Sequence, residues 1–243
     1  MRVTPLDIIQ KKFSAARRSG YDSDEVQSFL EEVRESMEEM LPYEECMEGH
    51  VTYDGRNFTE MDRQGRKAVR QEIGMLFQGS ALFDSMTVAE NVMFPLRMFS
   101  DATEAEMRDR AAFCLERVEL THATDKFPSE LSGGMQKRVG IARAIAMNPK
   151  YLFCDEPNSG LDPQTAIVID NLISDITQEY QITTVVVSHD MNSVMEASDT
   201  IHFVHQGSIC WHGSREGLLQ GGVKELEDFV FASELMRKIR KTV

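Results

Sequence analysis

The chain has 243 residues, of which 42% are hydrophobic, so it is long enough to bury a core and is not globally disordered. Its 26 basic and 40 acidic residues give a formal net charge of −14, which disfavours nucleic acid as a partner. No apolar run approaches the roughly 18 residues of a membrane-spanning helix, and the first residues lack the apolar stretch of a signal peptide. We therefore expect a cytoplasmic protein whose four single cysteines are free thiols.

Residues 1–42 predict a short leader followed by one amphipathic helix. Asp22 and Glu25 have the spacing of a capping box, and apolar residues then recur at three- and four-residue steps from Val26 to Met40. Pro42 ends the pattern. A helix with one apolar face needs a partner, so a coiled coil is one possible arrangement. The acidic residues 43–50 read as a junction to a second domain over residues 51–243.

The second domain alternates strands and helices. A strand, a turn and a strand are expected between residues 51 and 58, with a helix or loop at 63–70. Three apolar strands are predicted at 73–77, 151–154 and 184–187, and the last two read as runs of the buried type. Helices are predicted at 89–99, 104–118, 133–147 and 166–176, and a hairpin at 201–211 precedes a helical tail that ends basic. This alternation predicts an α/β fold with a parallel sheet.

Two carboxylates, Asp155 and Glu156, follow a predicted buried strand. Ligands of open α/β sheets bind at the carboxyl ends of the strands, where an aspartate can hold Mg²⁺ and a glutamate can deprotonate water. The alternative is that the two acids merely end a strand. The run Ser132-Gly133-Gly134 opens a predicted helix, with the serine as N-cap and glycines that let backbone N–H groups approach an anion. This second anion-binding feature favours the first interpretation.

Five ordered motifs resemble the nucleotide-binding domain of ABC transporters. Leu131–Gln136 reads LSGGMQ and resembles the signature motif, and YLFCDEP at 151–157 resembles Walker B. SGLD at 159–162 resembles the D-loop, SHD at 188–190 the switch histidine, and Gln78 the glutamine of the Q-loop. The resemblance implies a P-loop NTPase sheet with a helical signature subdomain that binds ATP and Mg²⁺.

The resemblance also implies a role for each motif residue. Glu156 would be the general base, Asp155 would bind Mg²⁺ through water, and Gln78 would sense both the metal and the water. His189 would contact the γ-phosphate. Two such domains face each other head to tail in this family, so the signature motif would grip the nucleotide of the partner protomer. The signature and D-loop residues implied in these contacts are Ser132, Gly133, Gly134, Gln136 and Asp162.

The segment FQGSALFDSMTVAENVMFPLR and the tail DFVFASELMRK resemble the ATPase of Mla-type phospholipid transporters. That resemblance implies a membrane permease and a lipid-binding Mce protein as partners, and a place at the cytoplasmic face of the inner membrane. An ATPase for another substrate class is the alternative.

One expected element of the family is not found in the sequence. Walker A has the form GxxxxGK[ST], in which backbone N–H groups and a lysine hold the phosphates. None of the 15 glycines of this chain is followed by lysine. We therefore expect the chain alone to hydrolyse ATP negligibly, and whether it acts as an enzyme stays open.

Residues 1–42 have a resemblance of their own. RVTPLDIIQKKFSAARRSGYDSDEVQSFLEEV resembles the N-terminal domain of DivIVA-type cell-division proteins. That family forms dimers and touches membranes through a basic and apolar loop, which corresponds here to residues 13–21. The alternative function is therefore a membrane-associated scaffold without ATPase activity. Three origins remain open for the combination: an artificial chimera, a rearranged gene, or a regulatory half that uses the Walker A of a partner.

Overall fold

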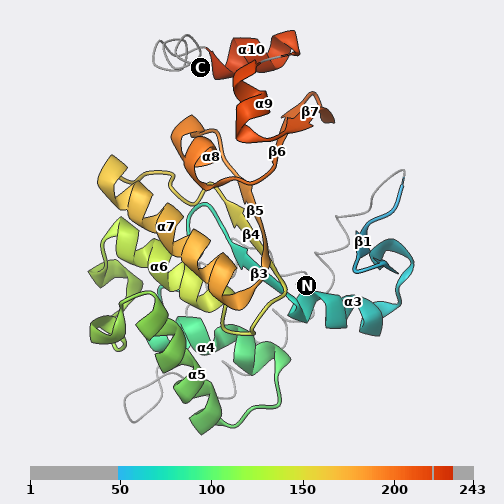
Figure 1. Cartoon of the computed structure of the whole chain (residues 1–243). Coiled ribbons are helices and arrows are strands. Elements are labelled where there is room, and N and C mark those ends of the chain that lie inside the picture. Colours follow the sequence, from blue (N-terminus) through green and yellow to red (C-terminus); the bar gives the residue numbers. More distant parts are fainter. Residues whose placement is uncertain (1–48, 221, 232–243) are drawn as a thin grey trace.

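The computed structural model describes residues 49–220 and 222–231 (Figure 1). The predicted leader and amphipathic helix of residues 1–42 lie outside the described residues, as do most of the junction and the basic end of the chain. Within the described part, no helix is both long and apolar enough to cross a bilayer.

A three-stranded parallel sheet forms the centre of the fold. Its strands are β3 (Ile73–Leu76), β4 (Tyr151–Asp155) and β5 (Thr183–Val187), in the order β3–β4–β5. In the register, Leu76 lies opposite Cys154, which in turn lies opposite Val186. Because the strands are parallel, their carboxyl ends meet at one edge of the sheet. The predicted α/β fold with a parallel sheet is confirmed.

Four helices supply most of the main core: α4 (Val88–Phe99), α5 (Glu104–Arg117), α6 (Gly133–Ala144) and α7 (Pro163–Tyr180). Each agrees with the predicted periodicity to within a few residues. Capping boxes with threonine as N-cap start α4 and α5. Short 3-10 turns η3 (Thr121–Ala123) and η4 (Pro128–Glu130) lead into α6. The fully buried aliphatic side chains of this core include Leu76, Leu115, Ile141, Leu152, Ile169 and Ile176.

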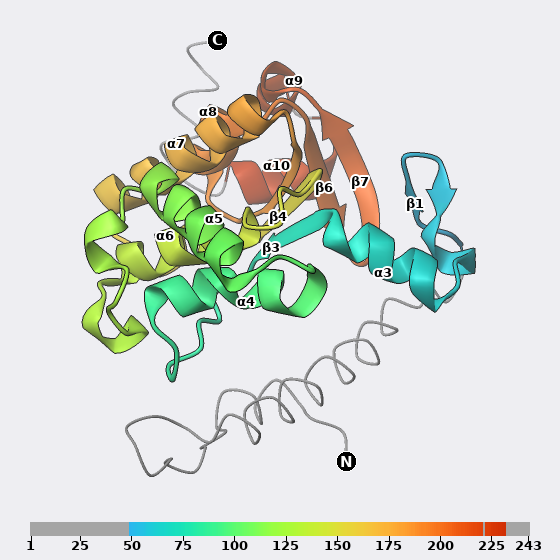
Figure 2. The ribbon, with the colours of Figure 1, turned by 90° about the horizontal axis from the view of Figure 1, so that it is seen from below.

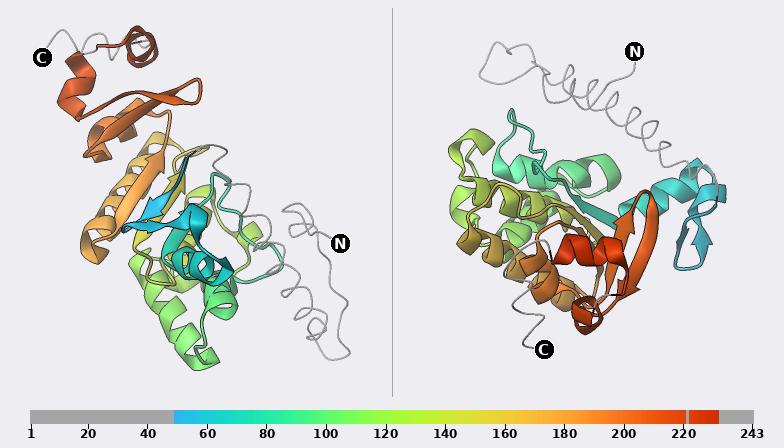
Figure 3. Two further views of the ribbon diagram at one scale, coloured as in Figure 1. Left: turned by 90° about the vertical axis from the view of Figure 1, so that its right-hand side faces the viewer. Right: turned by 90° about the horizontal axis from the view of Figure 1, so that it is seen from above.

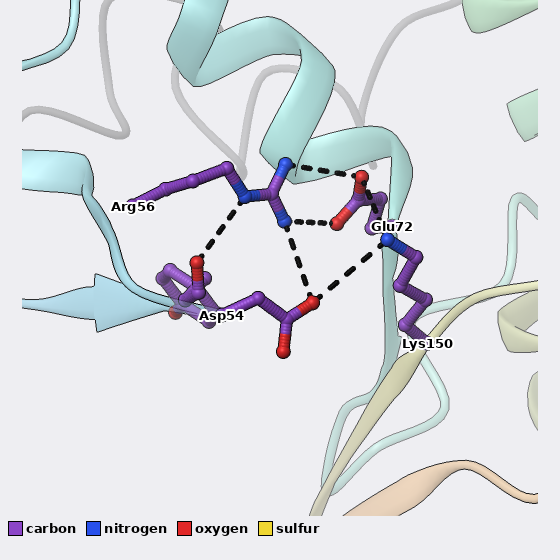
Figure 4. A network of polar contacts seen from close by, with 5 residues as sticks. Asp54, Arg56, Glu72 and Lys150 are labelled. Atoms are coloured by element: carbon purple, nitrogen blue, oxygen red, sulfur yellow. Dashed lines mark hydrogen bonds and ion pairs between the residues drawn. The ribbon is translucent and has the colours of Figure 1, made fainter.

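A hairpin of β1 (Thr52–Tyr53) and β2 (Arg56–Asn57), a 3-10 turn η2 (Phe58–Glu60) and helix α3 (Arg63–Gln71) precede the sheet. Figures 1 and 2 show this unit on the side of the sheet opposite α6 and α7. The Arg56 guanidinium donates to both carboxylate oxygens of Glu72, at 3.1 and 2.5 Å. Figure 4 shows the Lys150 ammonium approaching Glu72 at 3.4 Å and Asp54 at 3.8 Å.

This ion network lies at the amino ends of the strands. Glu72 directly precedes β3, and Lys150 directly precedes β4. The hydrogen bonds from Arg56 hold the pKa of the Glu72 carboxyl below its ordinary value. The rings of Tyr53 and Tyr151 also meet edge to face, with centroids 5.3 Å apart. The network therefore ties the hairpin to the sheet at the edge opposite the carboxyl ends of the strands.

The last part of the described chain forms a second, smaller core. It comprises α8 (Met191–Ala197), the hairpin of β6 (Ile201–His205) and β7 (Ser208–Gly213), α9 (Arg215–Gln220) and α10 (Lys224–Val230). Leu218, Leu226 and Val230 are buried there against Trp211. Figures 1 and 3 show the hairpin, α9 and α10 at the end of the molecule opposite α4 and α5. The predicted hairpin is confirmed, and it is a sheet separate from β3–β5.

One prediction about the sheet is wrong. The run 184–187 was expected to be buried like 151–154, yet Val185, Val186 and Val187 are exposed. Strand β5 bonds only to β4 among the described residues, so its other edge and much of both faces meet solvent. The three described cysteines, Cys114, Cys154 and Cys210, are free thiols as predicted.

Candidate functional site at the carboxyl edge of the sheet

Strand β4 delivers the two candidate carboxylates to the carboxyl edge. Asp155 is its last residue and lies opposite Val187 of β5. Glu156 follows with a φ of 46°, in the left-handed region that residues other than glycine seldom adopt. Its backbone N–H still donates to the Val187 carbonyl at 2.9 Å. Residues held in such sparsely populated backbone conformations cluster at functional sites.

The Glu156 carboxylate contacts the His189 imidazole. The distance from Glu156 Oε1 to His189 Nδ1 is 2.7 Å. His189 comes two residues after β5, so neighbouring parallel strands place both side chains at the same edge. The Glu156 side chain is 18% exposed and the His189 side chain is 75% exposed. The hydrogen bond to Glu156 raises the pKa of His189 above its ordinary value. A general base candidate and an exposed imidazole are thus paired.

A buried lysine that no sequence motif indicated contacts the backbone at this edge of the sheet. The Lys137 side chain comes from α6, and the residue is only 4% exposed. Its ammonium donates to the backbone carbonyls of Glu156, at 3.2 Å, and of Gln78. Burial lowers the pKa of Lys137. No pattern in the sequence distinguishes this lysine from a surface residue, because its role depends on two carbonyls from distant segments.

Gln78 comes two residues after β3 and is exposed. Its amide Nε2 lies 3.4 Å from the Ser159 hydroxyl, which belongs to the SGLD motif. The structure therefore joins Gln78 and Glu156 through Lys137, and it joins Glu156 and His189 through their direct contact. Asp155 adjoins them at the end of β4.

The glycines of the LSGGMQ motif lie at the start of α6, and Ser132 is its N-cap as predicted, accepting from the Met135 N–H at 3.3 Å. A Cβ atom on Gly134 would lie 2.6 Å from Cγ2 of Thr165, whereas one on Gly133 would meet Leu161 only at 3.6 Å. Packing against Thr165 is thus one reason for glycine at position 134, in addition to any contact with an anion.

Two further motif residues have local partners. The Gln136 amide donates to the Pro128 carbonyl at 3.0 Å and so points back toward η4. Asp162 is the N-cap of α7 and accepts from the Thr165 N–H at 3.0 Å and from its hydroxyl at 2.5 Å. These bonds from Thr165 lower the pKa of Asp162. The signature and D-loop residues therefore form a second group, at the place where the first turns of α6 and α7 are in contact.

Comparison with known proteins assigns this arrangement to a family. The family model described as ABC transporter matches residues 37–159, which is half of the chain. The chain belongs to the ABC transporter family. A second model, described as DivIVA protein, matches residues 3–68 and overlaps the first. The boundaries at residues 42 and 51 stay predictions.

The curated relatives of this ABC protein include methionine import ATP-binding proteins. MetN 1 of Pseudomonas syringae pv. syringae (strain B728a) is 41% identical over 165 residues, which are 68% of this chain and 49% of the relative. MetN of Desulfitobacterium hafniense (strain Y51) is 39% identical over 196 residues, 79% of this chain and 57% of the relative. The chain thus spans about half the length of these relatives. Their names give no support to the expected Mla-type phospholipid subfamily.

Solved ABC cassettes have the same fold. A dimeric structure of the bacterial ABC transporter cassette MJ0796 superposes with a TM-score of 0.63 and 32% identity, covering 74% of this chain and 81% of that one. The cbiO1 protein of Clostridium perfringens, part of the ABC transporter complex cbiONQ, gives a TM-score of 0.66 and 29% identity, covering 80% of this chain and 76% of that one.

The donor atoms at the edge fit Mg²⁺ in kind. The Asp155 carboxylate and the Gln78 amide offer the oxygen ligands that Mg²⁺ prefers, and Mg²⁺ usually takes one or two carboxylates together with substrate phosphates. Among the described residues, no group of three or more His, Cys, Asp or Glu side chains could hold a metal ion.

Proposed function

We propose that this chain is the ATP-binding subunit of a membrane importer, and that it uses ATP to drive a permease subunit. The contact between Glu156 and His189 at the carboxyl edge of a parallel sheet carries this proposal, because it pairs a base with an imidazole where phosphate ligands bind. The relatives named as methionine import proteins make methionine the first substrate to test. The expected phospholipid cargo rests on the sequence resemblance alone.

In this proposal each residue at the edge has one task. The Glu156 carboxylate accepts a proton from the attacking water while His189 holds one of its oxygens. The exposed imidazole of His189, whose pKa is raised, offers a positive N–H toward the terminal phosphate. Asp155 and Gln78 would hold Mg²⁺, which would supply positive charge to offset that of the phosphates. The Lys137 ammonium keeps the backbones of Gln78 and Glu156 in place.

The partner of the domain is proposed to be a second nucleotide-binding domain. Ser132 and Gly133 are exposed at the start of α6, so their backbone N–H groups are available to an anion on another protomer. A head-to-tail dimer would place this helix start against the nucleotide of the partner, with Asp162 at the junction. The dimeric state of the similar cassette MJ0796 supports this arrangement.

Binding of a fluorescent ATP analogue to the full chain tests the proposed function. We expect weak binding that requires Mg²⁺ and falls at least tenfold in Asp155→Asn. The matched control Asp109→Asn, which changes an exposed aspartate of α5, should bind as the wild type does. Because no glycine in these 243 residues is followed by lysine, steady hydrolysis by the chain alone should be negligible. Binding that ignores both Mg²⁺ and Asp155 would contradict the proposal.

A scaffold function at the membrane is the second candidate, because the DivIVA model matches residues 3–68. Its expected contact segment, residues 13–21, lies outside the described residues. The full chain should then sediment with vesicles of acidic phospholipid, and replacement of Arg17 and Arg18 by glutamate should abolish the effect. Equal sedimentation of the wild type and this variant would exclude the candidate.

A further inference from the structure

The side chain of Asn158, two residues after Glu156, joins three segments of the chain. Its amide nitrogen donates to both carboxylate oxygens of Asp170, at 2.8 and 2.9 Å, and to the hydroxyl of Ser193 at 2.8 Å. Asn158 lies in the turn after β4, Asp170 in α7 and Ser193 in α8. An amide nitrogen carries two hydrogens, so these contacts use its full capacity as a donor.

The neighbours of this amide determine its orientation. A reversed amide would place the oxygen of Asn158 against the carboxylate of Asp170, where both groups only accept hydrogen bonds. Oδ1 of Asn158 is instead buried, and it has no hydrogen-bond partner among the described residues. An unpaired buried acceptor is unfavourable for folding. What the asparagine contributes here is therefore the link that its nitrogen makes to α7 and α8.

The segments that follow β4 and β5 are joined mainly by side chains. In the described part of the chain, the backbone bonds between them end with the one from the Glu156 N–H to the Val187 carbonyl, at 2.9 Å. His189 lies two residues further on, and its side chain is 75% exposed, so little packing fixes the direction of the ring. The bond from Asn158 to Ser193 joins the same two segments just beyond the paired side chains.

The separation of these segments decides whether the Glu156 carboxylate reaches the His189 imidazole. Functional groups must be held to within about 0.5 Å of their working geometry, usually by hydrogen bonds from residues that do not themselves react. The bond from Asn158 to Ser193 limits the separation of the turn after β4 from α8. The bonds to the charged carboxylate of Asp170 are of a stronger kind and fix Asn158 itself against α7.

We propose that Asn158 is a positioning residue, whose amide joins the turn after β4 to α7 and α8 and thereby holds Glu156 and His189 in contact. The inference rests on the proposed function and deepens it, because it assigns the group that aligns the base with the imidazole. Asn158 does not itself contact the reacting groups in this assignment.

Titration of the histidines by NMR in the full chain tests the inference. The protein is labelled with carbon-13 on histidine, and the signal of His189 is assigned by its loss in His189→Gln. Glu156, first, and Asp190 are the acidic groups that raise the pKa of His189. Glu156→Gln therefore gives the pKa of the imidazole without its charged partner, while Asp190 is kept.

Two neutral substitutions break the link to α8. Asn158→Leu removes the donor, and Ser193→Ala removes the acceptor on α8. Neither substitution changes a charge, so a shift in the pKa of His189 reports a change in its contact with Glu156. The matched control is Asn192→Leu, which changes an exposed asparagine of the same helix.

We expect the pKa of His189 to be higher in the wild type than in Glu156→Gln. Asn158→Leu should remove about half or more of that difference, and Ser193→Ala should shift the pKa in the same direction. Asn192→Leu should titrate as the wild type does. If far-ultraviolet circular dichroism shows that Asn158→Leu does not fold, Ser193→Ala, which removes only a buried hydroxyl, decides the test.

Three results would overturn the inference. The wild type and Glu156→Gln could share one pKa for His189, the two neutral variants could keep the pKa of the wild type, or Asn192→Leu could lower it as much as they do. If nucleotide binding still required Mg²⁺ and Asp155, the proposed function would stand without the inference. If the pKa shifted as expected but the wild type bound no ATP analogue, the positioning of the contact would be supported and the proposed function would fail.

Discussion

Replacing Gly134 with alanine should destabilise the protein, whereas replacing its neighbour Gly133 should not. The new Cβ at position 134 would lie 2.6 Å from Cγ2 of Thr165, about 1 Å closer than two carbon atoms normally approach. At position 133 the nearest atom, of Leu161, lies 3.6 Å away in ordinary contact. The two substitutions are otherwise matched, since both occur in the first turn of α6.

The expected magnitude follows from the surroundings of Thr165. Rotating its side chain away from the new Cβ would move its hydroxyl from Asp162, a bond of 2.5 Å to a carboxylate. Overpacking costs about 1–3 kcal/mol, and alanine returns at most about 1 kcal/mol through its helix propensity. We expect Gly134→Ala to lower the free energy of unfolding by about 1–2 kcal/mol and Gly133→Ala to leave it unchanged or slightly higher. For a chain of this size, the first change lowers the Tm by about 2–8 °C.

Urea unfolding of the full chain, combined with a double-mutant cycle, measures this effect. Thr165→Ser removes the methyl group but keeps the hydroxyl, so Gly134→Ala should cost little in that background. A coupling free energy of about 1 kcal/mol or more is expected between positions 134 and 165. Equal stability of the two glycine variants, or additive effects of Gly134→Ala and Thr165→Ser, would refute the packing interpretation of Gly134.

Three further predictions concern other parts of the fold. The pKa of the Glu72 carboxyl is lower in the folded state, so its pair with Arg56 stabilises the protein above the unfolded carboxyl pKa of about 4.3, and this contribution is lost as the pH falls through the folded pKa. Glu72→Gln should therefore flatten the pH dependence of the free energy of unfolding, measured with urea between pH 6 and 3. Parallel curves for the wild type and the variant would contradict this. Lys137→Met leaves two backbone carbonyls without their donor and should lower the free energy of unfolding, measured with urea, by about 1–3 kcal/mol. Lys137→Gln keeps a donor and should lower it less. Equal losses in the two variants would show that hydrogen bonding is not the cause. In a Cys46→Ser background, a thiol reagent should label the exposed Cys210 quickly and should leave Cys114 and Cys154 unlabelled until the protein unfolds. Burial raises the pKa of Cys114 to about 11 and that of Cys154 to about 12, so neither forms the reactive thiolate near neutral pH. Equal labelling rates for the three cysteines would be inconsistent with the fold.

The sequence predicted the described elements well because their apolar periodicity and caps are local. The Ser132 cap, the helix after Thr87 and the parallel strands all follow from residues close in sequence. The sequence also placed Glu156 and His189 after two successive predicted strands, and the structure shows that these strands are neighbours and that the two side chains meet at 2.7 Å.

Contacts between distant segments could not be predicted in the same way. The position of Gly134 against Thr165 depends on how α6 meets α7, and the role of Lys137 depends on two backbone carbonyls brought together by the sheet. The exposure of β5 was not predicted, because an apolar run shows only that a strand is able to lie in a core. Whether helices and other strands pack against it depends on segments that are distant in the sequence.

The Lys137 ammonium has a mechanical consequence for the carboxyl edge of the sheet. It ties α6 to the backbone carbonyls of Gln78 and Glu156, and Arg143 of the same helix donates to the Ser80 carbonyl at 2.5 Å. Lys137 and Arg143 are six residues apart, or about 9 Å along the helix axis at 1.5 Å per residue. Two attachments at this separation resist tilting of the helix, so we expect α6 and the segment that carries Gln78 to move as one unit.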